Sequence, residues 1–260
     1  MLPKAGVWMI KSRQKSFLSR LGKIKALLDR LPFWYALRWL VARGISRWLE
    51  PELISSYSQF GEDRLVDALF GVRKTGIYVD VGCNHPVALS NTWKLYLRGW
   101  HGVAIDANPF LIKQYAKVRL RDVALAHVIS NSDEQVEFFV PHVSNLIGGI
   151  GEKTSGYWQR TRDNSDVFES RSSRLSEILR THDIPLRFDF LTIDTEGNEL
   201  DVLLSLDLGE FLPDLIAVEI HDFKMSSAHE SAVYNLLMEN GYEVVSWIHP
   251  TVFFRQLDSR

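Results

Sequence analysis

Polar residues, together with one glycine, gather at the ends of four apolar runs of this sequence. In chain order they are Asp80, Gly82, Asn84 and His85; Asp106; Asp194, Glu196 and Asn198; and Glu219, His221 and Asp222. Carboxylates and an imidazole at such positions can bind ribose hydroxyls, accept a proton or bind a cation. If the apolar runs are parallel strands of one sheet, these side chains meet at its carboxyl edge, where open α/β sheets bind their ligands.

The elements that would position these groups are predicted from Ser58 onward. The predicted strands are Ile77–Val81, Gly102–Ile105, Val123–Val128, Val136–Val140, Phe188–Ile193 and Leu215–Ile220, then an antiparallel pair, Tyr242–Trp247 and Thr251–Arg255. The predicted helices are Glu62–Leu69, Asn91–Arg98, Pro109–Val118, Leu175–Thr181, Leu200–Leu206 and Ser231–Asn240. Continuous apolar strands alternating with helices indicate an α/β fold, with a mostly parallel sheet and helices on both faces. We expect one such domain over residues 51–260.

Residues 1–50 differ from this domain in charge. They contain eleven Lys or Arg residues and two acids, whereas the remaining 210 residues contain 19 Lys or Arg and 30 acids. Apolar residues recur at helical spacing in this part, which predicts a basic, amphipathic helical extension. Its tryptophans and basic faces suit contact of residues 10–49 with an anionic membrane. Packing on the domain or on a second subunit is the alternative, and the oligomeric state stays open.

Composition narrows the classes of protein. A hydrophobic content of 46% and a charged content of 24% are ordinary for a soluble globular protein. The single cysteine, Cys83, rules out an internal disulfide and fits a reducing compartment. We see no apolar run of about 18 residues and no signal peptide, so we expect a cytoplasmic protein. Peripheral membrane contact through the extension is one of the two alternatives for that segment. The acidic domain lacks a basic groove for nucleic acid.

The loop after the first strand is poorly suited to a dinucleotide. In the G-x-G-x-x-G pattern, glycines let the backbone approach a pyrophosphate, but here only Gly82 is present, followed by Asn84 and Val87. The acid after the second strand is in place, because Asp106 lies 24 residues after Gly82 and can accept hydrogen bonds from a ribose. A ribose site without a pyrophosphate cradle suits S-adenosylmethionine. The alternative for this segment is a tight turn with a buried Asp80.

Three motifs in this order carry a family resemblance. They are "YSQFGEDRLV" (Tyr57–Val66), "YVDVGCNHPVALSNTWKLYLRGWHGVAIDANP" (Tyr78–Pro109) and "FLTIDTEGNELDVLLSLD" (Phe190–Asp207). Together they resemble the FkbM family of S-adenosylmethionine-dependent methyltransferases, over about residues 57–250. The resemblance implies the Rossmann-like fold of class I methyltransferases and methyl transfer to hydroxyl oxygens of sugars or natural products. The family's usual "GANxG" is replaced here by Gly82–Pro86.

The resemblance also implies which residues bind the cofactor. They are Gln59, Glu62, Asp80, Gly82, Asn84, Asp106 and Asp122. Asp80, Gly82 and Asn84 would frame the methionine tail, and Asp106 would hold the ribose. The two residues of the first motif would approach the cofactor from the segment that precedes the first strand. Asp122 is a candidate for the adenine edge, with a solvated acid in a turn as the alternative.

The candidates for the chemical step are Asp194, Glu196 and His221. Methyl transfer from a sulfonium to an oxygen needs alignment and a base for the hydroxyl proton. A sulfonium stabilises a nearby carboxylate, and His221 is the side chain that titrates nearest neutral pH. The alternatives are that Glu196 caps the following helix, that His221 is structural, and that His85 is the base. Asp194, Glu196, Glu219 and His221 together would also suit Mg²⁺ or a similar divalent cation, but the spacing does not require one and we expect no metal.

The acceptor is predicted from the polar stretch Gly148–Arg174, which we interpret as a long loop over the carboxyl edge. Its aromatic and basic residues, which suit a sugar-containing acceptor, are Tyr157, Trp158, Arg160 and Arg162. The favoured function is O-methylation of a sugar hydroxyl in a glycan, a glycolipid or a glycosylated natural product. An NAD-dependent oxidoreductase and a non-catalytic relative are the alternatives. The missing glycines count against the first, and the intact acids count against the second.

Overall fold

The structure is a computed structural model that describes residues 56–141, 149–150 and 165–257. These residues belong to a compact unit that runs from Ser55 to Arg260. The predicted extension over residues 1–50 lies outside the described residues, and so do Tyr157, Trp158, Arg160 and Arg162. Within the described ranges, no helix has both the length and the apolar character needed to cross a bilayer.

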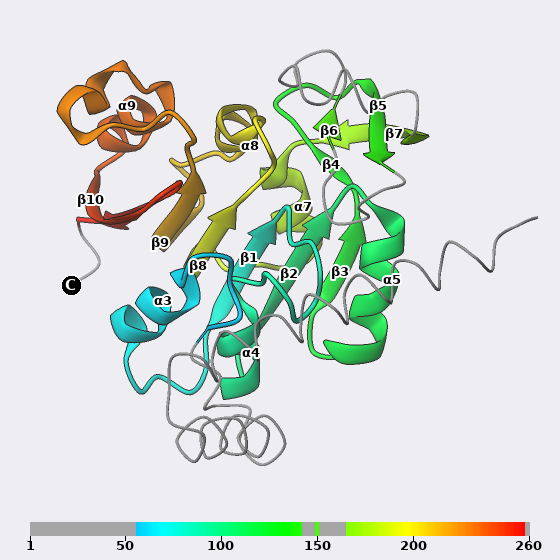
Figure 1. Cartoon of the computed structure of the whole chain (residues 1–260), viewed down its shortest axis with the longest axis horizontal. Coiled ribbons are helices and arrows are strands. Elements are labelled where there is room, and N and C mark those ends of the chain that lie inside the picture. The colour runs from blue at the N-terminus through cyan, green and yellow to red at the C-terminus, as the bar shows by residue number, and fades with distance from the viewer. Residues whose placement is uncertain (1–55, 142–148, 151–164, 258–260) are drawn as a thin grey trace, which may run out of the picture. The chain divides into compact units, whose positions relative to one another are not determined.

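A seven-stranded sheet forms the centre of the domain, with the strand order β10-β11-β9-β8-β1-β2-β3 (Figure 1). Its strands are β1 (Ile77–Val81), β2 (His101–Asp106), β3 (Val123–Ala126), β8 (Arg187–Ile193), β9 (Leu212–Glu219), β10 (Tyr242–Ile248) and β11 (Thr251–Gln256). The pairs β1·β2, β2·β3, β1·β8 and β8·β9 are parallel, whereas β11 is antiparallel to β9 and β10. This confirms the predicted mostly parallel sheet with its C-terminal antiparallel pair.

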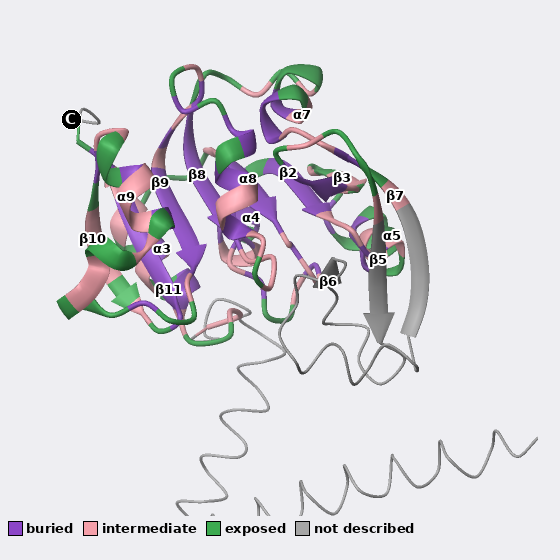
Figure 2. Ribbon diagram, turned by 90° about the horizontal axis from the view of Figure 1, so that it is seen from above, coloured by how far each residue is buried: buried purple, intermediate pink, exposed green. Residues whose placement is uncertain are grey.

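Helices cover both faces of this sheet. One face carries α3 (Glu62–Phe70), α4 (Trp93–Arg98) and α5 (Pro109–Val118); the other carries α7 (Leu175–Thr181), α8 (Glu199–Ser205) and α9 (Ala232–Glu239), which follows a 3₁₀ helix, Met225–Glu230. Strand side chains alternate between the faces. Val79 of β1 therefore packs in the core of the α7–α9 face, and Tyr78 in that of the α3–α5 face. The central strands are buried on both sides, which explains their continuous apolar sequences (Figure 2).

A second sheet corrects part of the prediction. It has the order β4-β7-β5-β6, with β4 (Val128–Ile129), β5 (Gln135–Pro141), β6 (Gly149–Ile150) and β7 (Ser165–Ser173). The stretch Gly148–Arg174 is therefore not one loop, because β7 pairs with β5 from Gln135↔Arg171 to Pro141↔Ser165. The predicted strand Val136–Val140 exists but belongs to this sheet. The sequence of β7, "SDVFESRSS", has no apolar run, so its pairing with β5 decides its conformation.

The five parallel strands β1, β2, β3, β8 and β9 end at one edge of the main sheet, which we call the carboxyl edge. Three acids on these strands stand two residues after core residues of the α3–α5 face, and therefore on that face: Asp80 after Tyr78, Asp106 after Ala104, and Glu219 after Ala217. The turn between β10 and β11 also reaches this edge, because Thr251 pairs with Glu219. The fold thus brings the predicted polar groups to one side of the sheet.

Candidate active site

The ends of β1 and β8 touch through their backbones. The N–H of Asp194 donates to the carbonyl of Val81 at 2.9 Å, and the N–H of Gly82 donates to that of Ile105 at 2.9 Å. Gly82 has φ +79°, and a Cβ on it would lie 1.7 Å from the carbonyl oxygen of Asp194. Only glycine satisfies both conditions. Since the strand order reverses at β1, this contact lies at the point where such sheets bind ligands.

Asp106, at the end of β2, holds the β1 loop (residues 82–92). Its Oδ2 accepts a hydrogen bond from the N–H of Asn84 at 2.9 Å, and its Oδ1 accepts one from the N–H of Asn108 at 2.8 Å. The first bond fixes Asn84 in a left-handed conformation, with φ 51°. Burial raises the pKa of Asp106, although both backbone hydrogen bonds oppose this. Each oxygen keeps a second lone pair, so the carboxylate can still accept a ribose hydroxyl.

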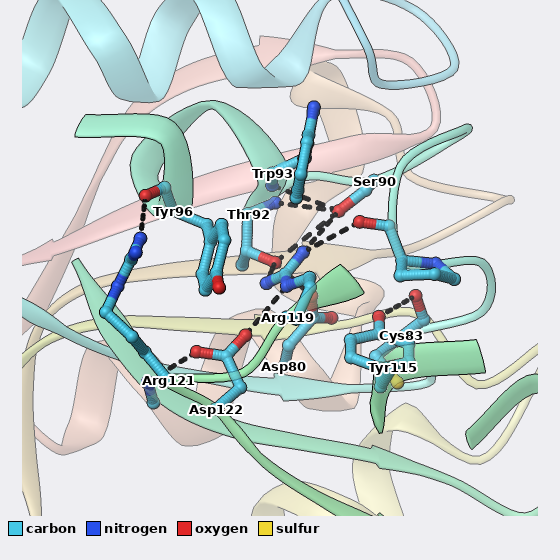
Figure 3. Close-up of polar contacts among 12 residues, drawn as sticks. Asp80, Cys83, Ser90, Thr92, Trp93, Tyr96, Tyr115, Arg119, Arg121 and Asp122 are labelled. Atoms are coloured by element: carbon cyan, nitrogen blue, oxygen red, sulfur yellow. Dashed lines mark hydrogen bonds and ion pairs between the residues drawn. The ribbon is translucent and has the colours of Figure 1, made fainter. Parts of the chain in front are cut away.

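Asp80 is a buried side chain that holds the β1 loop through a hydrogen bond. Thr92 donates its hydroxyl to Oδ2 of the buried Asp80 at 2.6 Å. Arg119, just after α5 and 1% exposed, donates to the Thr92 hydroxyl at 2.7 Å. It also donates to the Ser90 hydroxyl and the Pro86 carbonyl, each at 3.2 Å (Figure 3). The predicted contact of Asp80 with the methionine tail stays a prediction, since this carboxylate is engaged within the protein.

The stability of the protein should depend on pH through Asp80. Burial raises its pKa from 3.8 to about 6. The folded state therefore binds its proton more tightly than the unfolded state, so this stabilisation is present below about pH 4 and is lost as the pH rises to about 6. Asp80→Asn keeps an acceptor for Thr92 but does not titrate. We expect the free energy of unfolding of the wild type to fall by about 2.4 kcal/mol relative to Asp80→Asn between pH 4 and 7.

Urea denaturation of both proteins across this pH range measures the difference between them. The difference cancels the other titrating groups, which both proteins share. A difference that does not change with pH would contradict the raised pKa of Asp80.

Asp122 does not lie at the carboxyl edge. It stands immediately before β3, and its side chain is fully buried. Its Oδ1 accepts hydrogen bonds from the Tyr78 hydroxyl at 2.7 Å and the N–H of Gly102 at 3.1 Å, and its Oδ2 accepts one from Nε of Arg119 at 2.7 Å (Figure 3). This position agrees neither with an adenine contact nor with a solvated turn. Asp122 is the buried ion-pair partner of Arg119, a residue that the sequence did not single out.

The segment before α3 lies beside the β1 loop, because the N–H of Ser90 donates to the carbonyl of Tyr57 at 3.2 Å. Glu62 is buried and accepts a hydrogen bond from the N–H of Phe60 at 2.8 Å, which closes the turn into α3. Gln59 is exposed and faces a pocket of about 600 Å³. The pocket is lined by Ser56, Ser58, Gln59, Phe60, Gly61, Arg64, Leu65 and Ile248. Cofactor contact by Gln59 and Glu62 stays a prediction.

The other predicted residues gather where β8 and β9 end. We call Asp194, Glu196, Glu219 and His221 the strand-end cluster. Nε2 of His221 lies 3.5 Å from Oε2 of Glu219 and 3.8 Å from Oε2 of Glu196. Glu219 is 8% exposed, whereas the His221 side chain is 58% exposed. The cluster thus has a buried carboxylate on its inner side and an exposed imidazole on its outer side, which we call its mouth.

Burial and mutual repulsion make the carboxylates of the strand-end cluster basic. Burial raises the pKa of Asp194 well above its ordinary value, and the neighbouring Glu219 raises it further. Burial and Glu219 also raise the pKa of Glu196, although His221 opposes this. A carboxylate with a raised pKa is a better proton acceptor than an ordinary one. The cluster therefore favours a proton or another cation.

Glu196 does not cap the following helix. No side chain of the described residues caps α8 (Glu199–Ser205), and Glu199 instead closes the turn that precedes it. Its Oε1 accepts hydrogen bonds from the N–H of Gly197 at 2.8 Å and from the N–H and hydroxyl of Thr195 at 3.1 and 3.2 Å. Glu196 stands in the turn with φ 56° and its side chain reaches towards His221. Sequence reasoning missed Glu199, although an acid in the first turn of a predicted helix is a recognisable signal.

His85 is not part of the strand-end cluster. Its Nδ1 accepts hydrogen bonds from the N–H of Val87 at 3.1 Å and of Ala88 at 3.0 Å, so it holds a turn of the β1 loop. Burial lowers its pKa, which keeps the ring neutral and able to accept these bonds. This arrangement explains His85 without a role as the base.

The carboxyl edge fits S-adenosylmethionine better than a dinucleotide. The acids of this edge are Asp80, Asp106, Asp194, Glu196 and Glu219. They suit the sulfonium and ammonium charges of S-adenosylmethionine and would repel a pyrophosphate. The β1 loop also contains Pro86, which has no N–H to offer a phosphate. Asp106 remains available for the ribose in either case, so charge is what separates the two ligands.

Comparison with known proteins shows the family of the chain. Residues 80–244, or 165 of 260, match the family model of the methyltransferase FkbM domain. No curated protein matches the chain. A TehB-like SAM-dependent methyltransferase from Corynebacterium glutamicum ATCC 13032 Kitasato is a distant structural match, with a TM-score of 0.40 and 14% identity over 85% of this chain and 96% of that chain. Because the family model spans more than half of its length, the chain belongs to the FkbM family and is an S-adenosylmethionine-dependent methyltransferase with the class I Rossmann-like fold.

Proposed function

We propose that this methyltransferase acts on oxygen and methylates a hydroxyl group of a sugar-containing acceptor, in a glycan, a glycolipid or a glycosylated natural product. The observation that carries this proposal is the strand-end cluster beside the backbone contact of β1 and β8. Bound S-adenosylmethionine supplies an electrophilic methyl group and a neutral leaving group. The chain itself must align the hydroxyl and take its proton.

The strand-end cluster offers the groups for both tasks. The backbone N–H of Asp194 is hydrogen-bonded to the end of β1, so its side chain lies next to the start of the β1 loop. The raised pKa values of Asp194 and Glu196 make them effective acceptors for the hydroxyl proton. His221, at the mouth, is the first member that an incoming acceptor would meet. Carboxylates and imidazole also bind the neighbouring hydroxyls of a sugar, which distinguishes a sugar from a simple alcohol.

Charge supports a neutral acceptor group. The acids of the carboxyl edge would repel a phosphate or a carboxylate close to the reacting hydroxyl. A sugar attached to a lipid meets this condition, because its hydroxyls can lie far from the lipid phosphate. The basic residues 10–49 would then bring the acidic domain to an anionic membrane on the cytoplasmic side.

Radiolabelled methyl transfer tests the acceptor class directly. The full-length protein is incubated with S-adenosylmethionine labelled in the methyl group and with separate panels of sugar glycosides, amines, phenols and nucleic acids. We expect label only in the sugar panel, as a methyl ether that survives alkali. Transfer to amines or nucleic acid instead would overturn the proposal.

His221→Ala should lower kcat for a sugar acceptor by about 100-fold, because the hydroxyl loses a group that orients it. The side chain is exposed, so folding should persist, and Kd for S-adenosylhomocysteine should stay within about threefold of the wild type. His229→Ala, at another exposed histidine, is the matched control. Steady-state kinetics and titration calorimetry measure the two effects. An unchanged kcat would remove His221 from the site.

A further inference from the structure

We propose that Glu196, Glu219 and His221 bind a divalent metal cation at the mouth of the strand-end cluster. The sequence alone did not require a metal, because Glu196 and Glu219 lie on different strand ends. The structure brings one ligand atom from each of the three residues within 4.8 Å of the others. Binding of the cation stands on this geometry, and only its role towards a sugar rests on the proposed function.

The separations are close to those of a mononuclear site. Nε2 of His221 lies 3.5 Å from Oε2 of Glu219 and 3.8 Å from Oε2 of Glu196. With bonds of about 2.1 Å, two ligands of one cation lie about 3.0 Å apart at a right angle and about 3.4 Å apart in a tetrahedron. Rotamer adjustments of roughly an ångström close this difference. The two side chains that must move are the more exposed ones, Glu196 and His221.

Glu219 provides the second, independent observation. It is 8% exposed, and its Oε2 has no hydrogen-bond partner among the described residues. This same oxygen is the one directed at His221. The Glu219 carboxylate also shares a hydrogen bond with Asp194 when Asp194 carries a proton, and a cation can replace that proton. A buried carboxylate oxygen without a hydrogen-bond donor is costly, and a cation would satisfy it. Burial of Glu219 also holds that ligand in place before the cation arrives.

The donor atoms indicate which cation would bind. The imidazole and two carboxylates, without a thiolate, favour Mn²⁺ or a similar divalent cation. Three protein ligands leave coordination positions open, as catalytic metal sites do. Two neighbouring sugar hydroxyls could fill them, which would align and acidify the hydroxyl that is methylated.

Binding of Mn²⁺ alone tests the site without an acceptor. The full-length protein is stripped with a chelator, the chelator is removed, and Mn²⁺ is titrated while its electron paramagnetic resonance signal reports the free ion. We expect one saturable site in the wild type. Glu219→Gln and His221→Ala should each raise Kd by about 100-fold. Glu243→Gln, at an exposed glutamate of β10, is the control and should bind as the wild type does.

Circular dichroism of each variant separates loss of a ligand from loss of the fold. Saturable binding that the two ligand variants do not weaken would place the cation elsewhere and overturn the proposal, as would no binding at all. Repeating the titration with saturating S-adenosylmethionine gives a further outcome. Displacement of Mn²⁺ by it would mean that the acids serve the charges of the methyl donor, which also overturns the proposal.

The proposed function can fail separately. If Mn²⁺ binds through these three residues but no sugar is methylated, the metal site stands and the acceptor class is wrong. The opposite result has two parts. Sugars are methylated at an unchanged rate after chelation, and Glu219→Gln and His221→Ala have the same Kd for Mn²⁺ as the wild type. In that case the acceptor class stands and the metal site is wrong.

Discussion

Arg119→Met is expected to lower the free energy of unfolding by about 3–5 kcal/mol, because it leaves Asp122 charged and buried without its cation. Both side chains of this pair are fully buried, with Nε of Arg119 2.7 Å from Oδ2 of Asp122. Methionine fills much of the same volume, so the lost charge and hydrogen bonds dominate the effect. The guanidinium also lies 5.1–5.9 Å from the ring centres of four aromatic residues, Tyr78, Trp93, Tyr96 and Tyr115.

The matched control is Arg171→Met. Arg171 pairs with Asp133 at 2.5 Å, but both side chains are exposed, so water replaces the lost partner. Its free energy of unfolding should be nearly that of the wild type, as urea denaturation followed by circular dichroism measures it. The double variant Arg119→Met, Asp122→Asn should be more stable than the sum of its single changes predicts. Equal effects of Arg119→Met and Arg171→Met would contradict this account of the buried pair.

Gly82→Ala has the second large expected effect. We expect a loss of about 3–5 kcal/mol in the free energy of unfolding, together with loss of S-adenosylhomocysteine binding. The new Cβ would meet the carbonyl oxygen of Asp194 at 1.7 Å, and φ +79° is itself unfavourable for alanine. Both contacting groups are backbone, so relief requires β1 and β8 to separate. That separation would disrupt the carboxyl edge at the point where the β1 loop begins.

Gly71→Ala separates the two causes. Gly71 also has a positive φ, +58°, but a Cβ there would meet nothing within 4 Å among the described residues. Only the conformational cost remains, about 1–3 kcal/mol, because φ 58° with ψ −134° is a conformation that suits glycine and not alanine. Urea denaturation and calorimetry with S-adenosylhomocysteine measure both variants. If Gly82→Ala were no worse than Gly71→Ala, the close approach of the two strands would not matter to stability.

Local patterns in the sequence were sufficient for most elements. The predicted helix Pro109–Val118 agrees with α5 at both ends, because Pro109 starts it and the Asn108 side chain accepts a hydrogen bond from the N–H of Phe110 at 3.0 Å. The central strands were recognisable because burial on both faces leaves a continuous apolar run. Parallel strands then imply a shared edge, which is why residues as distant as Glu196 and His221 could be predicted to meet.

The predictions that failed involve contacts that no local pattern records. Strand β7 has a polar sequence, and its pairing partner β5 lies about thirty residues earlier. Asp122 looks like an ordinary acid between a helix and a strand, yet the long side chain of Arg119 makes it part of a buried network. Glu199, at the start of α8, closes the turn that contains Glu196, because its side chain folds back onto the N–H groups of Thr195 and Gly197.

The sequence by itself determined the α/β fold, the family and the edge of the sheet that carries the site. It did so because apolar runs, periodicity and motif spacing involve residues that are close together in the sequence. Only the tertiary structure decided which charged groups lie within contact of each other. The Arg119–Asp122 pair and the arrangement of Glu196, Glu219 and His221 depend on strand register and side-chain direction, which are set by packing between segments far apart in the chain.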